Sequence, residues 1–171
     1  NTFALKILGS SAAIQAKGRA QSAQILSYRN NNFLIDCGEN TQSLLRKYSV
    51  SQTKIKAIFI SHLHGDHFLG LFGLISTLAL LGRKSPLRIF GPIGLKEIIT
   101  TQAKYSGTTF SYELTVKEIE DEFEGELYQD SDLVVSTFKL VHRVATHGFL
   151  FKEKPQERKL KIDLIPPYVK N

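Results

Sequence analysis

The sequence has few of the residues that stabilise secreted folds. Its 171 residues include one cysteine, Cys37, and neither methionine nor tryptophan. A single cysteine excludes an internal disulfide framework and is typical of a reducing compartment, so we expect a cytoplasmic protein. Because methionine is missing even at position 1, we expect that Asn1 is not the native start.

Long hydrophobic runs are also missing. The longest, Phe68–Leu81, is interrupted by glycine, serine and threonine and is too short to span a bilayer. The first residues lack the basic and apolar regions of a secretory signal peptide. With 42% hydrophobic and 22% charged residues, the composition is that of a globular protein, and we expect no membrane partner.

Charge is unevenly distributed along the chain. The net charge is +6, but the segment Glu113–Asp132 contains nine acids and one base. The remaining residues contain 21 bases and seven acids, a net charge of +14. Such a surface attracts polyanions through its long-range field and through counterion release, although a basic surface can also serve solubility alone.

Hydrophobic periodicity alternates between strand and helix, which predicts an α/β layered fold with helices covering a sheet. The expected strands are Phe3–Leu8, Ser22–Arg29, Asn32–Asp36, Ile55–Ile60, Leu87–Phe90, Leu114–Ile119, Leu133–His142 and Gly148–Phe151. The expected helices are Glu39–Tyr48, His67–Leu81 and Ile93–Lys104. The pair Asn30-Asn31 is typical of a tight hairpin turn, and Ser10–Gln21 is expected to be a loop.

All five histidines fall in two segments. They are His62, His64 and His67 in the first, and His142 and His147 in the second. The first segment reads His-Leu-His-Gly-Asp-His and directly follows an apolar strand. His62 and His64 can converge on one cation if the loop is extended. Asp66 and His67 can turn toward a second, because Gly65 permits a tight turn between the pairs.

Each of these residues, taken alone, has a structural explanation that involves no metal. A histidine at a strand end is often polar filler, and Asp66 could cap the helix that follows. Packing does not readily explain three histidines and an aspartate within six residues, so the segment predicts a metal site. Nitrogen and carboxylate ligands without thiolates suit Zn²⁺, with Mn²⁺ as an alternative.

The segment His62–His67 matches the H-x-H-x-D-H signature of the metallo-β-lactamase superfamily. Its neighbourhood resembles the ribonuclease Z family, the tRNA 3′-processing endoribonucleases. The matching stretches are Leu8–Ala13, Asp36–Gln42, Phe59–Ser61, Phe68–Leu74, Ser76–Leu78, Ile89–Pro92, His142–Val144 and Gly148-Phe149. The resemblance extends from about Phe3 to Phe151.

The resemblance implies a role for each residue of the motif. His62 and His64, joined by His142, would hold one zinc ion, and Asp66 with His67 would hold the other. Two such cations lower the pKa of a water and stabilise the oxygens of a phosphodiester under attack. Asp66 would also position or deprotonate that water as the catalytic residue.

Other family positions are matched less fully. Lys17 and Arg19 resemble the family's P-x-K-x-R-N loop, which contacts the acceptor end of tRNA, although Gln15 and Ala20 depart from the pattern and the loop could simply be solvated. Asp36 would support the histidines through a hydrogen bond. His147 stands where the family often has tyrosine, and we expect it at the surface or beside the ligands.

The implied fold is the αββα sandwich of the superfamily, with only its N-terminal half and the start of a flexible arm evident here. We expect residues 1–151 to form that N-terminal part and residues 152–171 to begin a basic, tRNA-gripping arm, although its charges could equally form a solvated face. The family's later metal ligands have no counterpart, so we expect this chain alone to bind metal weakly and to cleave poorly.

The expected function is removal of the 3′ trailer from precursor tRNA by a homodimeric, zinc-dependent endoribonuclease. Two alternatives remain open. One is another hydrolase of the superfamily, acting on a cyclic nucleotide, a thioester or an aryl sulfate. The other is a non-catalytic RNA-binding relative.

Overall fold

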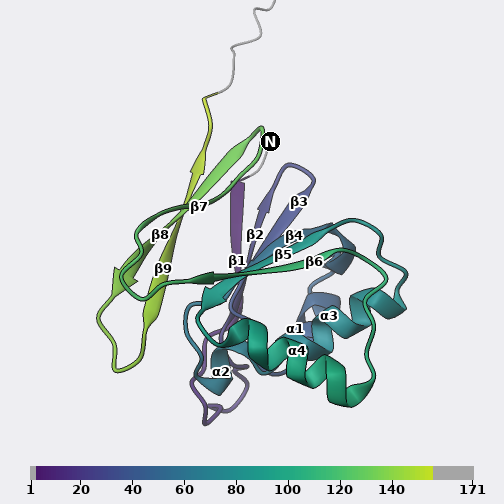
Figure 1. Cartoon of the computed structure of the whole chain (residues 1–171). Coiled ribbons are helices and arrows are strands. Elements are labelled where there is room, and N and C mark those ends of the chain that lie inside the picture. The colour runs from purple at the N-terminus through teal and green to yellow at the C-terminus, as the bar shows by residue number, and fades with distance from the viewer. Residues whose placement is uncertain (1–2, 156–171) are drawn as a thin grey trace, which may run out of the picture.

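The computed structural model describes residues 3–155, which form two β-sheets and one layer of helices (Figure 1). The strands are β1 (Phe3–Gly9), β2 (Ala23–Tyr28), β3 (Asn31–Ile35), β4 (Ile55–Phe59), β5 (Leu87–Pro92), β6 (Leu114–Ile119), β7 (Gly125–Gln129), β8 (Leu133–Leu140) and β9 (Thr146–Glu153). The helices are α1 (Thr41–Lys47), α2 (Gly65–Phe68), α3 (Leu71–Leu80) and α4 (Leu95–Ser106), with a 3₁₀ turn at η1 (Gln52–Lys54).

Six strands form the larger sheet in sequence order, β1 to β6. The pairs β1–β2 and β2–β3 are antiparallel, whereas β3, β4, β5 and β6 run parallel to one another. The second sheet, β7-β8-β9, is antiparallel. Parallel strands present their carboxyl ends at one edge of the sheet, where ligand sites of α/β folds form.

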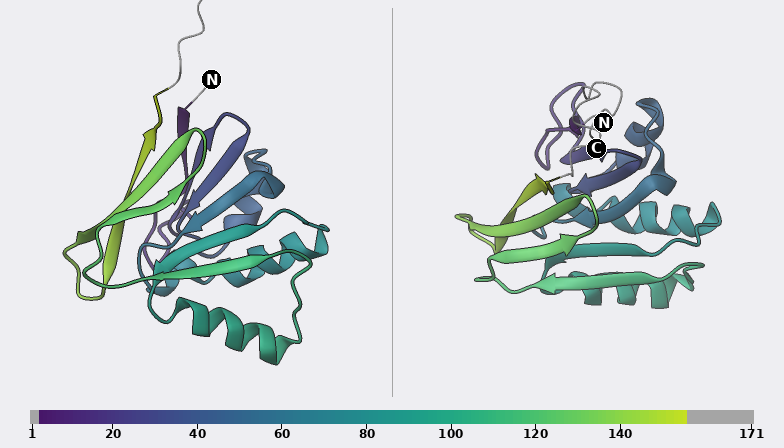
Figure 2. Two further views of the ribbon diagram at one scale, coloured as in Figure 1. Left: turned by 45° about the horizontal axis from the view of Figure 1, so that its top comes forward. Right: turned by 90° about the horizontal axis from the view of Figure 1, so that it is seen from above.

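The strands of the larger sheet are apolar on both faces, and alternate residues face different layers. In β4 and just after it, Ile58 and Ile60 pack in the core beneath the helices, while Ala57 and Phe59 pack in the core that includes the second sheet. Figure 2 shows α3 and α4 on the side of the larger sheet opposite β7–β9. The α/β fold expected from the sequence is confirmed, and the layers observed are helix, sheet and sheet.

Three local expectations were wrong. The hairpin turn is Arg29-Asn30, because Tyr28 pairs with Asn31 and Arg29 adopts a φ of 53°. The Glu113–Asp132 segment contains a strand, β7, that its acidic composition concealed. The helix expected at His67–Leu81 is two helices, α2 and α3, interrupted before Leu71.

A close backbone approach accompanies the break between α2 and α3. A Cβ on Gly70 would lie 2.1 Å from the carbonyl oxygen of Gly38, so only glycine fits there. The Gly70 N–H donates to the carbonyl of Cys37 at 2.9 Å, and the Cys37 N–H donates to the carbonyl of His67 at 2.7 Å. These bonds join the end of β3 to α2 and fix the direction in which α2 leaves the sheet.

In the part of the chain that the structure describes, no helix is both long enough and apolar enough to cross a membrane.

Candidate metal centre

The histidine segment begins where β4 leaves the sheet. The Ile60 N–H still bonds to the carbonyl of Phe90 at 2.8 Å, and beyond it the chain turns away from β5. His62 and His64 follow in extended backbone, with φ −75° and ψ 139° at His64, and α2 starts at Gly65. The sequence places the segment after a buried strand, and the parallel sheet directs it to the edge where ligand sites form.

Three imidazoles converge at this edge. His62, His64 and His142 each offer a ring nitrogen, and these nitrogens all lie within 4.8 Å of one another. Nε2 of His142 is 3.4 Å from Nδ1 of His64. His142 comes from the connection between β8 and β9, 78 residues along the chain from His64. The second sheet thus delivers the third member of a group that can hold one metal ion.

Asp66 and His67 lie beside this group. Oδ2 of Asp66 is 3.5 Å from Nε2 of His67, and the rings of His67 and His62 have centroids 4.0 Å apart. The carboxylate and the imidazole can therefore face a position next to the one that the three histidines surround. Asp66 lies in the first turn of α2 and makes no helix-capping hydrogen bond, so the alternative that it caps the helix was wrong.

Asp36 lies beneath the cluster and is buried, with 4% of its surface exposed. Its Oδ2 accepts hydrogen bonds from Nδ1 of His67 at 2.6 Å and from the Ser22 hydroxyl at 2.9 Å. Its Oδ1 accepts the Ser61 N–H at 2.9 Å. Because Nδ1 of His67 donates to Asp36, Nε2 keeps its lone pair and faces Asp66.

The protonation of the two buried imidazoles follows from these surroundings. Burial, and next the charge of His67 and His64, lowers the pKa of His62 to about 4. Burial also acts to lower the pKa of His67, but the hydrogen bond and charge of Asp36 outweigh it, so that pKa is raised. An imidazole binds a cation only in its neutral form, so protons compete more strongly with a metal at His67 than at His62.

Ser61 and Ser22 also contribute to the cluster. The Ser61 hydroxyl lies 2.9 Å from Nδ1 of His62 and 3.4 Å from Nδ1 of His67. No pattern in the sequence marks these serines, because their partners are 14 or more residues away or depend on the turn after β4. The Cys37 thiol is fully buried, and burial raises its pKa to about 12, so it is not a ligand.

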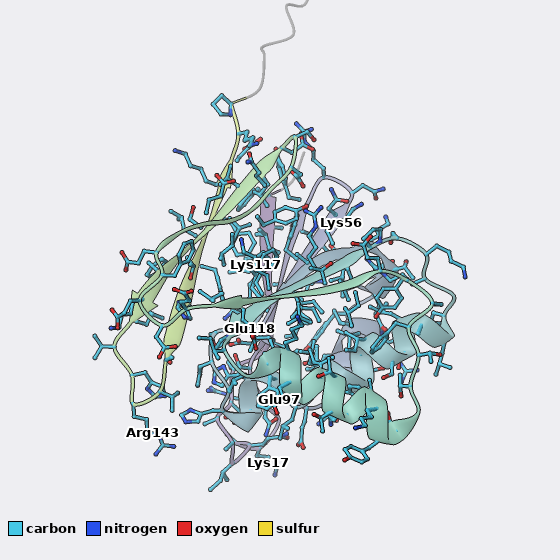
Figure 3. The ribbon with its side chains drawn as sticks, viewed as in Figure 1. Lys17, Lys56, Glu97, Lys117, Glu118 and Arg143 are labelled. Carbon is cyan, nitrogen blue, oxygen red and sulfur yellow. The ribbon has the colours of Figure 1, made fainter. Side chains whose placement is uncertain are left out.

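Lys17 and Arg19 lie apart from the histidine cluster. They line an exposed hollow of about 470 Å³ between the loop before β2 and α1, together with Asn40 and Lys47. Figure 3 shows Lys17 and Arg143 at the end of the molecule where α2 lies. Lys17 is thus near the metal edge, but among residues 3–155 no side-chain hydrogen bond or ion pair joins Lys17 or Arg19 to the cluster.

His147 is not at the surface. None of its area is exposed, and its backbone N–H donates to the Ser61 carbonyl at 3.0 Å. Neither ring nitrogen has a hydrogen-bond partner among the described residues. The alternation of β9 places His147 on the same face as Phe149 and Phe151, toward the larger sheet. Its burial lowers its pKa.

Replacing His147 with leucine, which has a similar volume, is expected to increase the free energy of unfolding by about 1 kcal/mol. The reason is that an unpartnered buried polar group is costly and an apolar one of similar shape is not. For a chain of this size that gain corresponds to a melting temperature about 2–4 °C higher, measurable by thermal denaturation. A decrease of more than about 2 kcal/mol would show that the imidazole has a polar partner.

Comparisons with known proteins identify the family of this chain and its relatives. The family described as Anti-Pycsar protein Apyc1 matches residues 3–155. Ribonuclease Z of Cytophaga hutchinsonii is 51% identical over 164 residues, which are 96% of this chain and 52% of that protein. Ribonuclease Z of Bacteroides fragilis is 39% identical over 97% of this chain and 55% of its own length. The chain spans about half the length of these curated relatives.

Solved structures agree with the sequence relatives. The short form of human tRNase Z superposes with a TM-score of 0.81 at 35% identity, covering 87% of this chain and 64% of that one. The metallo-β-lactamase fold protein YhfI of Bacillus subtilis superposes with a TM-score of 0.65 at 20% identity, over 86% of this chain and 56% of that one, which shows the fold alone.

Proposed function

This chain belongs to the family described as Anti-Pycsar protein Apyc1 and has the metallo-β-lactamase fold of its ribonuclease Z relatives, and from that premise we propose that it is part of an endoribonuclease that removes the 3′ trailer from precursor tRNA. The observation that best supports the proposal is the convergence of His62, His64 and His142 from two separate sheets. Such convergence is expected of a metal-dependent hydrolase.

The donor set fits two divalent cations, with Zn²⁺ first and Mn²⁺ as the alternative. His62, His64 and His142 would hold one, and Asp66 with His67 would hold the other. Bound there, the cations would lower the pKa of a water and offset the negative charge on the phosphodiester oxygens. With three protein donors at one position and two at the other among the described residues, each shell would be incomplete and would leave room for water and substrate.

Asp66 is the group we assign to proton transfer. Apart from the buried Asp36, Asp66 has the carboxylate of the cluster, and a carboxylate can accept a proton from water. Its Oδ2 lies 3.5 Å from Nε2 of His67. We propose that an oxygen of Asp66 orients the attacking water and takes its proton as the water approaches phosphorus. Asp36 would act one layer further out, since it holds His67 with Nε2 directed toward Asp66.

The Asp36→Asn variant is expected to bind zinc about 10- to 100-fold more weakly than the wild type. The carboxylate accepts from Nδ1 of His67, the Ser22 hydroxyl and the Ser61 N–H, whereas the amide nitrogen of asparagine cannot accept, so at least one of these bonds is lost and the imidazole is held less firmly. Zinc affinity is measured by competition with a chromophoric chelator. Ser27→Ala, which removes a hydroxyl bonded to Asn32 away from the cluster, serves as the control. An unchanged zinc affinity for Asp36→Asn would contradict the assigned role.

Further parts of the proposal concern the substrate and the assembly. Lys17 and Arg19 suit phosphate as a point charge and a bidentate fork, and they would contact the RNA near the metal edge. We propose a cytoplasmic homodimer, with residues 1–151 as the N-terminal part of the metallo-β-lactamase domain. The proposed arm, residues 152–171, lies largely outside the described residues, although β9 continues to Glu153.

A second candidate is a hydrolase of a small phosphodiester. It is favoured by the donor set itself, because cations held by His62, His64 and His142 would activate water toward any phosphodiester and do not select RNA. The decisive experiment incubates the intact protein with a precursor tRNA and with bis(p-nitrophenyl) phosphate, in Zn²⁺, in Mn²⁺ and after chelation. Metal-dependent release of the 3′ trailer supports the proposal. Hydrolysis of the small diester without cleavage of the RNA would favour the alternative. Binding of the RNA without cleavage in either metal would indicate a non-catalytic relative.

A further inference from the structure

A second basic hollow lies at the other end of the larger sheet. It has a volume of about 290 Å³ and is bordered by the β2–β3 turn, the end of α1 and the residues before β4. Its lining includes Lys6, Arg29 and Lys54, five asparagine or serine side chains, and no acid. The composition is that of a surface which binds anionic groups and offers neutral hydrogen-bond donors between the cations.

The lysines of this hollow are held in place without being neutralised. Nζ of Lys6 lies 3.5 Å from the carbonyl oxygen of Tyr48 and 5.8 Å from the centre of the Tyr48 ring. Nζ of Lys54 donates to Oδ1 of Asn30 at 2.5 Å. Within residues 3–155 neither lysine forms an ion pair, whereas Arg29 is paired with Asp132. Two positive charges are therefore available to a ligand.

Tyr48 adds an exposed aromatic ring between cations. It is 40% exposed and has Lys6 on one side and Lys47, with Nζ 5.4 Å from the ring centre, on another. Aromatic rings flanked by lysines are typical of surfaces that bind nucleic acid, because a base can stack where the phosphates are neutralised.

Lys47 joins this hollow to the one described above. It lines the hollow of Lys17 and Arg19 and also packs near Tyr48, which lines the second hollow. The first 56 residues contain eight bases and two acids, one of which is the buried Asp36. Of the acids in Glu113–Asp132, Asp132 reaches the second hollow, where it pairs with Arg29, and the others lie on β6, β7 and the segments around them. A continuous basic surface thus extends along α1.

The two ends of this surface are far apart. The second hollow is near the start of β4 and the histidines follow its end, so five residues of strand separate them, or about 17 Å at 3.3 Å per residue. Figure 3 shows Lys56, at the start of β4, toward the end of the molecule opposite Lys17. A single small phosphodiester cannot contact both ends, whereas a polynucleotide can.

We propose that Lys6, Lys54 and Tyr48 form a second RNA-binding site, which holds the sugar-phosphate backbone of the substrate at a distance from the metal centre. The identity of the RNA rests on the proposed function. The distance between the two sites requires that the substrate be a polymer. It adds binding energy far from the reacting phosphate, so the site acts on affinity for the substrate and leaves the chemical step unchanged.

The test is the double variant Lys6→Gln/Lys54→Gln of the intact protein. Two lost phosphate contacts are expected to raise the KM for precursor tRNA about tenfold at moderate salt, with kcat unchanged. The Kd from fluorescence anisotropy should rise in parallel, and the slope of log Kd against log salt concentration should fall by about 1.4–1.8. Hydrolysis of bis(p-nitrophenyl) phosphate should stay the same.

The matched control is Lys84→Gln/Lys104→Gln, which removes the same charge from exposed positions in the α3–α4 layer. If both double variants change RNA affinity equally, the effect is one of net charge and the second site is excluded. An equal loss on the small diester would also overturn the inference. If the wild type binds precursor tRNA without cleaving it and Lys6→Gln/Lys54→Gln still weakens binding, the proposed function falls and the second RNA site stands.

Discussion

On the proposed function, replacing His64 with alanine is expected to eliminate cleavage of precursor tRNA and to weaken zinc binding strongly. Nδ1 of His64 lies 3.4 Å from Nε2 of His142, and its ring centroid lies 4.7 Å from that of His62, so it belongs to a group of three donors. Removing a donor leaves two, which should reduce zinc affinity beyond the roughly 10- to 100-fold caused by changes outside the ligands.

The measurement combines zinc content after gel filtration with single-turnover cleavage. Val141→Ala is a suitable control, because its fully exposed side chain neighbours His142 in the sequence and removing it should change neither quantity. Thermal denaturation of the metal-free proteins separates loss of metal from loss of fold. A His64→Ala protein that keeps its zinc and its cleavage rate would refute the assignment of the metal centre.

Replacing Phe59 with alanine is expected to cause the largest loss of stability, about 3–5 kcal/mol. Phe59 is fully buried between the sheets. Its ring stacks on Phe90 at 5.1 Å between centroids and meets Phe149 and Phe151 of β9, each at 5.3 Å. At about 2–4 °C for each kcal/mol, the melting temperature should fall by about 10 °C.

The same substitution should also weaken zinc binding, because Phe59 packs against the sheet that delivers His142. The control is Leu80→Ala, whose side chain is 87% exposed, and for which we expect a change within about 0.5 kcal/mol. Denaturant unfolding of the metal-free chain measures the stability change of Phe59→Ala and of Leu80→Ala. A loss below about 1 kcal/mol for Phe59→Ala would mean that the two sheets are not held together by this aromatic cluster.

The local sequence predicted most elements because their periodicity matches their environment. The continuous apolar run Ile58–Ile60 indicates a strand buried on both faces, as it is. Prediction from the local sequence failed where a tertiary contact decides the local geometry. The break before α3 depends on the approach of Gly70 to Gly38, and β7 forms because β8 pairs with it despite its acidic residues.

The candidate metal centre, too, was predictable from the sequence only in part. The motif His62–His67 was evident because its residues are adjacent in the sequence. A short segment between a strand and a helix keeps such residues close together whatever the rest of the fold does. Their tautomers depend on Asp36 and Ser61, which the motif alone does not assign. His147 was expected at the surface or beside the ligands; the packing of β9 against the larger sheet excludes the surface, and the His147 backbone bonds to Ser61, which contacts His62.

What the sequence alone determined is the layered α/β fold and the histidine motif at the end of a buried strand, since both depend on residues close together in the chain. What only the tertiary structure decided is the meeting of His142 with His62 and His64. That meeting needs β8 and β9 to pack on Phe59 and its neighbours, an arrangement set by long-range burial of aromatic side chains. The basic surface along α1 has the same origin, because Lys6 and Lys54 lie 48 positions apart in the sequence and meet only in the fold.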